Sequence, residues 1–138
     1  MKVIIYKGFW SVEDVRDNRD CLWLYGDNDI KRGKGGQAII RDEPNTFGIP
    51  TKKLPNNNNN AFYRDTEYDE NCRKIKLALD KIKIVSKKYK AIVLPEAGFG
   101  TGLAKLHITA PKTLQFLNNE VENLYLNSTK NKYSFKPK

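Results

Sequence analysis

Two glycine-rich segments contain most of the residues that could bind a charged ligand. The first spans residues 26–36 and includes Gly26, Lys34, Gly35 and Gly36. The second reads Gly98-Phe99-Gly100-Thr101-Gly102. Glycine has no Cβ, so backbone N–H groups in such segments can approach a phosphate closely. The two segments predict a phosphate-binding site, and the alternative is that these glycines only form tight turns.

Polar and charged side chains close to the glycines could complete such a site. Lysine can act as a point charge and arginine as a two-pronged donor toward an anion, although either is also common on a solvated surface. Thr101 could donate a hydrogen bond to a phosphate. The predicted ligand-binding residues besides the glycines are Lys34, Gln37, Arg41, Thr51, Lys52, Phe99 and Thr101.

Three residues near expected strand ends are candidates for catalysis: Asp27, Asn28 and Glu96. A buried carboxylate there could act as a general base in the hydrolysis of a P–O or glycosidic bond. For Asp27 and Asn28 the alternative is turn formation through hydrogen bonds to the backbone. No metal and no cofactor are expected, because His107 is the only histidine and neither cysteine is near it in sequence.

Four short apolar runs predict the strands that would position these residues: 3–6, 21–25, 47–51 and 91–94. Pro50 places the third of them at a sheet edge or at its own end. After residue 25 the glycines are expected to end the strand, and residues 37–41 are compatible with a helix.

Helices are predicted between the strands. Residues 11–14 form a capping-box pattern that could open a short helix. A long helix is expected from residue 65 or 66, because apolar residues recur there at spacings of three and four, and another from residues 109–111. Strands interleaved with helices indicate a single α/β domain with a mixed or mainly parallel sheet. Because ligands bind outside the carboxyl ends of such strands, both glycine loops are expected in one cleft.

The whole chain has 138 residues and a net charge of +9. This length predicts one ligand-binding domain, residues 1–127, followed by a basic, flexible tail, residues 128–138. The charge attracts anions of any kind, and the tail mixes lysines with Tyr133 and Phe135, so a nucleic-acid-binding module is one alternative and a structural protein without a small ligand is another. The first apolar run is broken at Lys7, which predicts a cytoplasmic protein without a membrane partner.

The motifs in residues 26–28, 33–38, 41–45, 48–52 and 98–104 resemble a small α/β family from phage and bacterial genomes. Its loops in turn resemble those of macro domains, which embrace ADP-ribose. The resemblance implies that Gly35 and Gly36 lie in a first phosphate loop and Gly98 to Gly102 in a second, with Asp27 as a candidate for the aspartate that holds adenine. It also implies binding, or hydrolysis, of ADP-ribose or a related nucleotide, in the host cytoplasm if the protein is phage-encoded.

Overall fold

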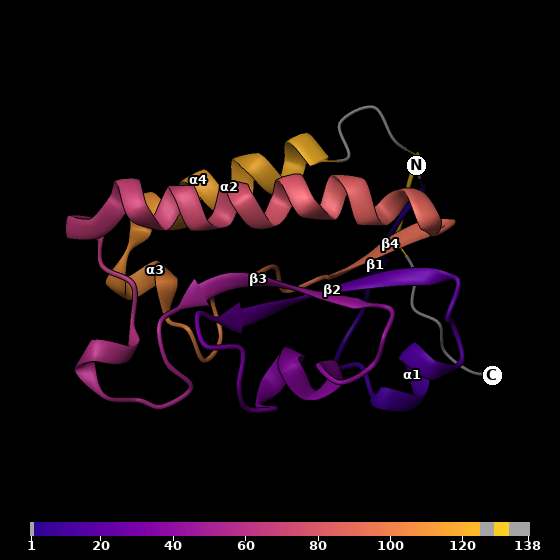
Figure 1. Ribbon diagram of the computed structural model, residues 1–138, viewed down its shortest axis with the longest axis horizontal. Coiled ribbons are helices and arrows are strands. Elements are labelled where there is room, and N and C mark those ends of the chain that lie inside the picture. Colours follow the sequence, from indigo (N-terminus) through magenta and orange to yellow (C-terminus); the bar gives the residue numbers. More distant parts are fainter. Residues whose placement is uncertain (1, 125–128, 133–138) are drawn as a thin grey trace.

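The computed structural model describes residues 2–124 and 129–132, and its centre is a parallel β-sheet (Figure 1). The five strands lie in the order β3-β2-β4-β1-β5, and every paired neighbour runs parallel. Their bounds are β1 Lys2–Tyr6, β2 Cys21–Asn28, β3 Thr46–Lys52, β4 Ala91–Pro95 and β5 Thr129–Lys132. The predicted single α/β domain with a mainly parallel sheet is confirmed.

Alternate residues of the strands enter two separate apolar layers. Val3 packs in the layer beneath α2 (Tyr68–Val85) and α4 (Pro111–Leu124), whereas its neighbour Ile4 packs in the layer that faces α1 (Val12–Arg16). This alternation follows from the twofold side-chain repeat of a strand. Helices therefore cover both faces of the sheet (Figure 1). All residues of β4 are buried, and so are all residues of β2 except the half-buried Gly26.

The two long helices follow the apolar periodicity of the sequence. In α2 the buried side chains include Ile75, Leu79 and Ile82, and in α4 they include Leu117 and Val121. The short helix α1 has the predicted capping box, because the Ser11 hydroxyl accepts from the Asp14 N–H while the Asp14 carboxylate accepts from the Ser11 N–H.

One local prediction near the first glycine loop is wrong. β2 does not end at Tyr25 but continues through Gly26, Asp27 and Asn28, because β3 offers a parallel partner at each of these positions. Tertiary pairing thus overrides the low strand propensity of glycine and aspartate.

The helix-compatible residues 37–41 overlap a short 3-10 helix, η1 (Gly36–Ile40). Its Ala38 and Ile40 pack in the same apolar layer as Ile4.

The sheet edges are β3 and β5. Pro50 lies in β3, so its predicted edge position is confirmed. Within the tail predicted from residue 128, Thr129–Lys132 form β5 beside β1, while residue 128 and residues 133–138 lie outside the described part. The remaining short helices are η2 (Asn59–Ala61), η3 (Asp65–Glu67), η4 (Ser86–Lys88) and α3 (Leu106–Thr109).

Candidate functional site

A cavity of about 830 Å3 lies at the carboxyl edge of the sheet and extends across the ends of four strands. Its wall follows the strand order: first the segment after β1, then the two glycine loops after β4 and β2, then the end of β3. The wall includes Gly8, Phe9, Trp10, Gly26, Asp27, Asn28, Arg32, Gly33, Gly35, Gly36, Gln37, Ala38, Arg41, Thr51, Lys52, Pro55, Pro95, Glu96, Ala97, Gly100, Thr101, Gly102, Leu103 and Ala104. The expected meeting of both loops in one cleft is therefore observed.

The first glycine loop exposes a run of backbone donors. The N–H groups of residues 33–37 donate to no acceptor within the described residues. The loop is held instead by side chains: the Asn28 amide donates to the Arg32 carbonyl at 2.7 Å, and Arg41 Nε donates to the Gly33 carbonyl at 2.8 Å. These bonds use loop carbonyls and leave the loop N–H groups available to an anion.

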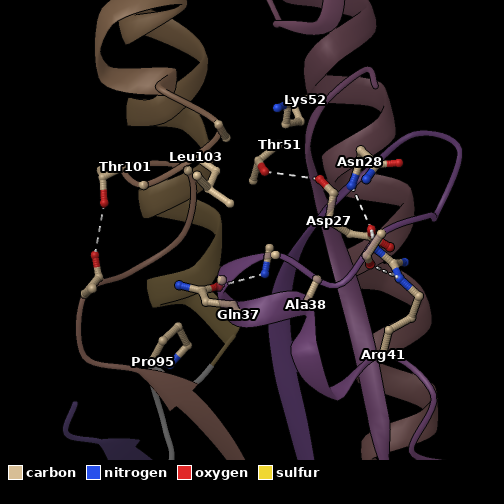
Figure 2. A pocket seen from close by; sticks show the side chains of 18 of the residues that line it. Asp27, Asn28, Gln37, Ala38, Arg41, Thr51, Lys52, Pro95, Thr101 and Leu103 are labelled. Carbon is tan, nitrogen blue, oxygen red and sulfur yellow. Dashed lines mark hydrogen bonds and ion pairs between the residues drawn. The ribbon is translucent and has the colours of Figure 1, made fainter. Parts of the chain in front are cut away.

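Asp27 and Arg41 form a nearly buried ion pair beneath this loop. Arg41 Nη2 lies 2.6 Å from Asp27 Oδ1, and the same oxygen accepts from the Asn28 N–H at 2.7 Å (Figure 2). The carboxylate requires a glycine at position 48, because a Cβ there would lie 2.6 Å from Asp27 Oδ2. Loss of one partner from a buried pair typically costs about 3–5 kcal/mol. We infer that the ion pair of Asp27 with Arg41 stabilises the conformation of the first glycine loop.

The second glycine loop joins β4 to α3 and has a longer run of available donors. Gly98 and Gly100 have φ angles of +79° and +85°, a region that only glycine adopts easily. At the end of the loop, the Leu106 N–H donates to the Gly100 carbonyl at 2.7 Å. The six N–H groups of residues 99–104 donate to no acceptor in the described part of the chain.

Gln37 connects the two loops through both ends of its side-chain amide. Its Oε1 accepts from the Gly26 N–H at 2.8 Å (Figure 2), and its Nε2 donates to the Gly98 carbonyl at 2.8 Å. Its own carbonyl accepts from Trp10 Nε1 at 3.1 Å. One residue thus fixes the end of β2, the second loop and the segment after β1 relative to one another.

Leu103 brings the second loop against the first. A Cβ at Gly35 would lie 3.0 Å from Leu103 Cδ1, and one at Gly36 would lie 3.5 Å from it. Figure 2 shows the Leu103 side chain extending from its loop into the space between the two loops. The loops can approach this closely because positions 35 and 36 have no side chains, so together they form two walls of one narrow space.

Lys52 is a buried cation at the β3 end of the cavity. Only 8% of the residue is exposed to solvent, and its Nζ donates to the Asn56 carbonyl at 2.8 Å. The Nζ atoms of Lys52 and Lys105 lie 4.7 and 5.8 Å from the centre of the Phe62 ring. Burial, with the nearby Lys105 charge, lowers the pKa of Lys52. No carboxylate within the described residues forms an ion pair with it.

Most of the predicted site residues line the cavity, but their roles differ. Asn28 and Thr51 are tied to loop carbonyls, and Thr51 Oγ1 donates to the Asp27 carbonyl at 3.1 Å. Glu96 is exposed on the wall, and its carboxylate has no hydrogen bond or ion pair to a described residue. Of the three predicted catalytic residues, only Glu96 keeps a side chain available to a ligand.

Three predicted binding residues lie outside the cavity wall. Lys34 forms a surface ion pair with Asp42. Phe99 is 3% exposed and packs in the core beneath α2 and α4, since the loop turns it inward. Gly98 is not part of the wall, but its carbonyl is the acceptor for Gln37.

Phe9 is the most informative residue that the sequence reasoning missed. It is fully exposed at the cavity rim, while the adjacent Trp10 is buried against Tyr6 and Trp23. Gly8 has a φ of +80°, which allows the sharp change of direction between β1 and this segment. The available signal was a glycine followed by two aromatic residues directly after a strand.

Within residues 2–124 and 129–132, no group of three or more metal-ligating side chains is present. No helix in this part of the chain is long and apolar enough to cross a membrane.

The fold and the cavity define an α/β domain with a large pocket at the carboxyl edge of a parallel sheet. The model of a family of unknown function, DUF7831, matches residues 5–120, which is most of the chain and includes both glycine loops. The chain belongs to this family. No curated protein and no solved structure matches it.

Proposed function

We propose that this domain binds ADP-ribose or a closely related nucleotide diphosphate, with the diphosphate between the two glycine loops. The observation that carries the proposal is the pair of backbone N–H runs, residues 33–37 and 99–104, which have no acceptor among the described residues. All of these residues except Lys34 and Phe99 line one cavity. Consecutive N–H groups in glycine-rich turns form anion-binding concavities. Each of the two runs could bind one phosphate of a diphosphate.

The length of the cavity supports a nucleotide over a free phosphate. The wall extends from the β1 end of the sheet to the β3 end, and the glycine loops occupy only its middle. Its volume of about 830 Å3 is within the range of small-molecule and cofactor sites. A ligand that fills it would have a group on each side of its phosphates.

Phe9 supports an aromatic base on the β1 side. A fully exposed phenylalanine ring at a cavity rim gains little from the protein itself, since none of its surface is buried. A stacked base would cover it, and stacking of a base on an aromatic ring contributes about 1–3 kcal/mol. The proposed ligand therefore has its base at Phe9 and its phosphates at the loops.

The proposal is for binding. Asp27 and Asn28 hydrogen-bond within the first loop, so neither is free to act as a base. Glu96 is the carboxylate that hydrolysis would use. The resemblance of the loops to those of macro domains favours ADP-ribose among the nucleotide diphosphates, and the same resemblance suggests a role for the protein in a phage-infected cell.

Thermal unfolding with ADP-ribose, NAD, ATP and a short oligonucleotide tests this function. A ligand that binds only the folded state raises the midpoint, by an amount that grows with concentration. We expect ADP-ribose to raise the midpoint most, and calorimetric titration to give one site. A rise with the oligonucleotide alone would favour the nucleic-acid-binding alternative, and no rise with any ligand would favour a structural protein.

A further inference from the structure

The cavity has a different chemical character at its two ends. In the sheet order β3-β2-β4-β1, the strand ends that carry the glycine loops, β2 and β4, lie between the other two. The β1 end presents Phe9, and the β3 end presents Lys52. A nucleotide with its base at Phe9 and its phosphates at the loops would therefore direct its remaining group toward Lys52.

The β3 end has an excess of positive charge. Lys52 is buried, and its Nζ donates to the neutral Asn56 carbonyl but forms no ion pair with a described carboxylate. The Nζ of Lys105 lies near the same Phe62 ring as the Nζ of Lys52. Lys53, one residue along, does not line the cavity and forms an ion pair with Glu67 at 2.6 Å. A buried ammonium group is costly unless an anion compensates it. The contrast between neighbouring lysines points to an anion that comes with the ligand.

We propose that Lys52, assisted by Lys105, binds an anionic group at the end of the ligand opposite the base. This inference rests on the proposed nucleotide function and narrows the ligand to a nucleotide diphosphate whose terminal sugar carries a carboxylate or a phosphate. The main chain would hold the diphosphate, and Lys52 would select ligands by their terminal charge. An ammonium–carboxylate hydrogen bond contributes about 1.5–3 kcal/mol, which corresponds to about tenfold or more in affinity.

A matched pair of ligands isolates this contact. The probes are ADP-ribose and the acid formed by oxidation of its terminal aldehyde, ADP-ribonate, in which C1 of the sugar is a carboxylate. Calorimetric titration of the full chain gives the affinity ratio of the two. We expect the native protein to prefer ADP-ribonate by about tenfold.

Three substitutions assign the preference to a residue. Lys52→Met keeps the length of the side chain and removes the charge, so the preference should fall to near unity. Lys52→Arg should retain most of it. Lys53→Met is the control and should leave it unchanged, because Lys53 is paired with Glu67 outside the cavity. Thermal unfolding of each variant verifies that it is folded.

Each outcome has a distinct meaning. Equal affinity of the native protein for the two probes would overturn the anion site and leave the proposed function intact. An equal loss of both affinities in Lys52→Met would place Lys52 at the diphosphate and also overturn it. Failure of both probes to bind the native protein would overturn the proposed function, and this inference with it. If Lys52→Met does not fold, Lys105→Met should reduce the preference, and an unchanged preference there would contradict the proposal.

Discussion

The side-chain amide of Gln37 joins the two glycine loops, since its Nε2 donates to the Gly98 carbonyl at 2.8 Å while its Oε1 accepts from the Gly26 N–H. Residues 61 positions apart in the sequence are thereby fixed at one edge of the sheet. The Gln37 side chain therefore helps to set the spacing of the proposed phosphate site, together with the packing of Leu103 against Gly35.

Substitution of Gln37 by leucine should weaken ADP-ribose binding by about tenfold and lower the free energy of unfolding by about 1–3 kcal/mol, because both loop contacts are lost. Gln37→Glu keeps an acceptor for the Gly26 N–H but loses the donor to the Gly98 carbonyl. Its affinity for ADP-ribose and its free energy of unfolding should therefore lie between those of the native protein and of Gln37→Leu. Calorimetry and urea unfolding measure the two effects. Gln115→Leu, on an exposed position of α4, is the control. Native affinity in Gln37→Leu would show that the bridge does not position the site.

Gly102→Val tests the second loop. A Cβ at Gly102 meets nothing within 4 Å, so the free energy of unfolding should change by no more than about 0.5 kcal/mol. A branched side chain next to the cavity should still hinder the approach of a phosphate to the backbone, so we expect at least about tenfold weaker binding of ADP-ribose. Native affinity in this folded variant would indicate that the loop is not a phosphate cradle.

Gly100→Val is a poorer test, although the sequence alone favours it. From the sequence, the substitution is expected to weaken ligand binding much more than folding. In the structure a Cβ at Gly100 would lie 2.8 Å from Leu106 Cδ2, in the core, and the φ of +85° is unfavourable for valine. We now expect a loss of folding stability that obscures any effect on binding.

Phe9→Ala should reduce affinity only for ligands that carry a base. Affinity for ADP-ribose should fall by about tenfold, through the loss of stacking, while affinity for pyrophosphate and ribose 5-phosphate should stay the same. Phe9→Trp should retain binding of ADP-ribose. Stability should not change, because Phe9 is fully exposed. Ile84→Ala, at an exposed position of α2, is the control. Equal losses for all three ligands would contradict a base-stacking role.

The stability of the fold should decrease at alkaline pH in part through Cys21. Burial, together with the charge of Asp20, raises the pKa of this thiol to about 11 from an ordinary value near 9. The folded state thus holds the thiol proton more tightly than the unfolded state does. The stabilisation that the Cys21 thiol contributes to folding is therefore complete below about pH 9 and is lost as the pH rises toward 11. In urea unfolding, Cys21→Ala should show a shallower decline of stability between pH 9 and 11. A decline as steep as in the native protein would contradict this assignment.

The sequence predicts the architecture well because the strands and long helices are defined by local apolar patterns. Residues 21–25 and 91–94 are continuous apolar runs, and both are central strands. The pairing of Gly26–Asn28 with β3 could not be predicted in this way, because it depends on a neighbouring strand rather than on local propensity.

For the candidate site, the sequence predicts which loops meet but not what each side chain does. Glycine spacing and the strand-end rule were enough to bring Gly35 and Gly100 to one cavity. The ion pair of Asp27 with Arg41 and the double role of Gln37 involve partners far apart in the chain, so no local pattern indicates them. The local sequence also gives no sign that Lys52 is buried while its neighbour Lys53 forms an ion pair with Glu67.

Backbone amide NMR during a titration with ADP-ribose tests the central claim most directly, because it reports on the N–H groups themselves. We predict that the amide resonances of residues 33–37 and 99–104 shift together and saturate at one equivalent of ligand, with the large downfield proton shifts of new hydrogen bonds to phosphate. Amides on the far sides of α2 and α4 should not move. Saturation with both runs unmoved, or shifts in one run alone, would contradict a diphosphate held between the two loops.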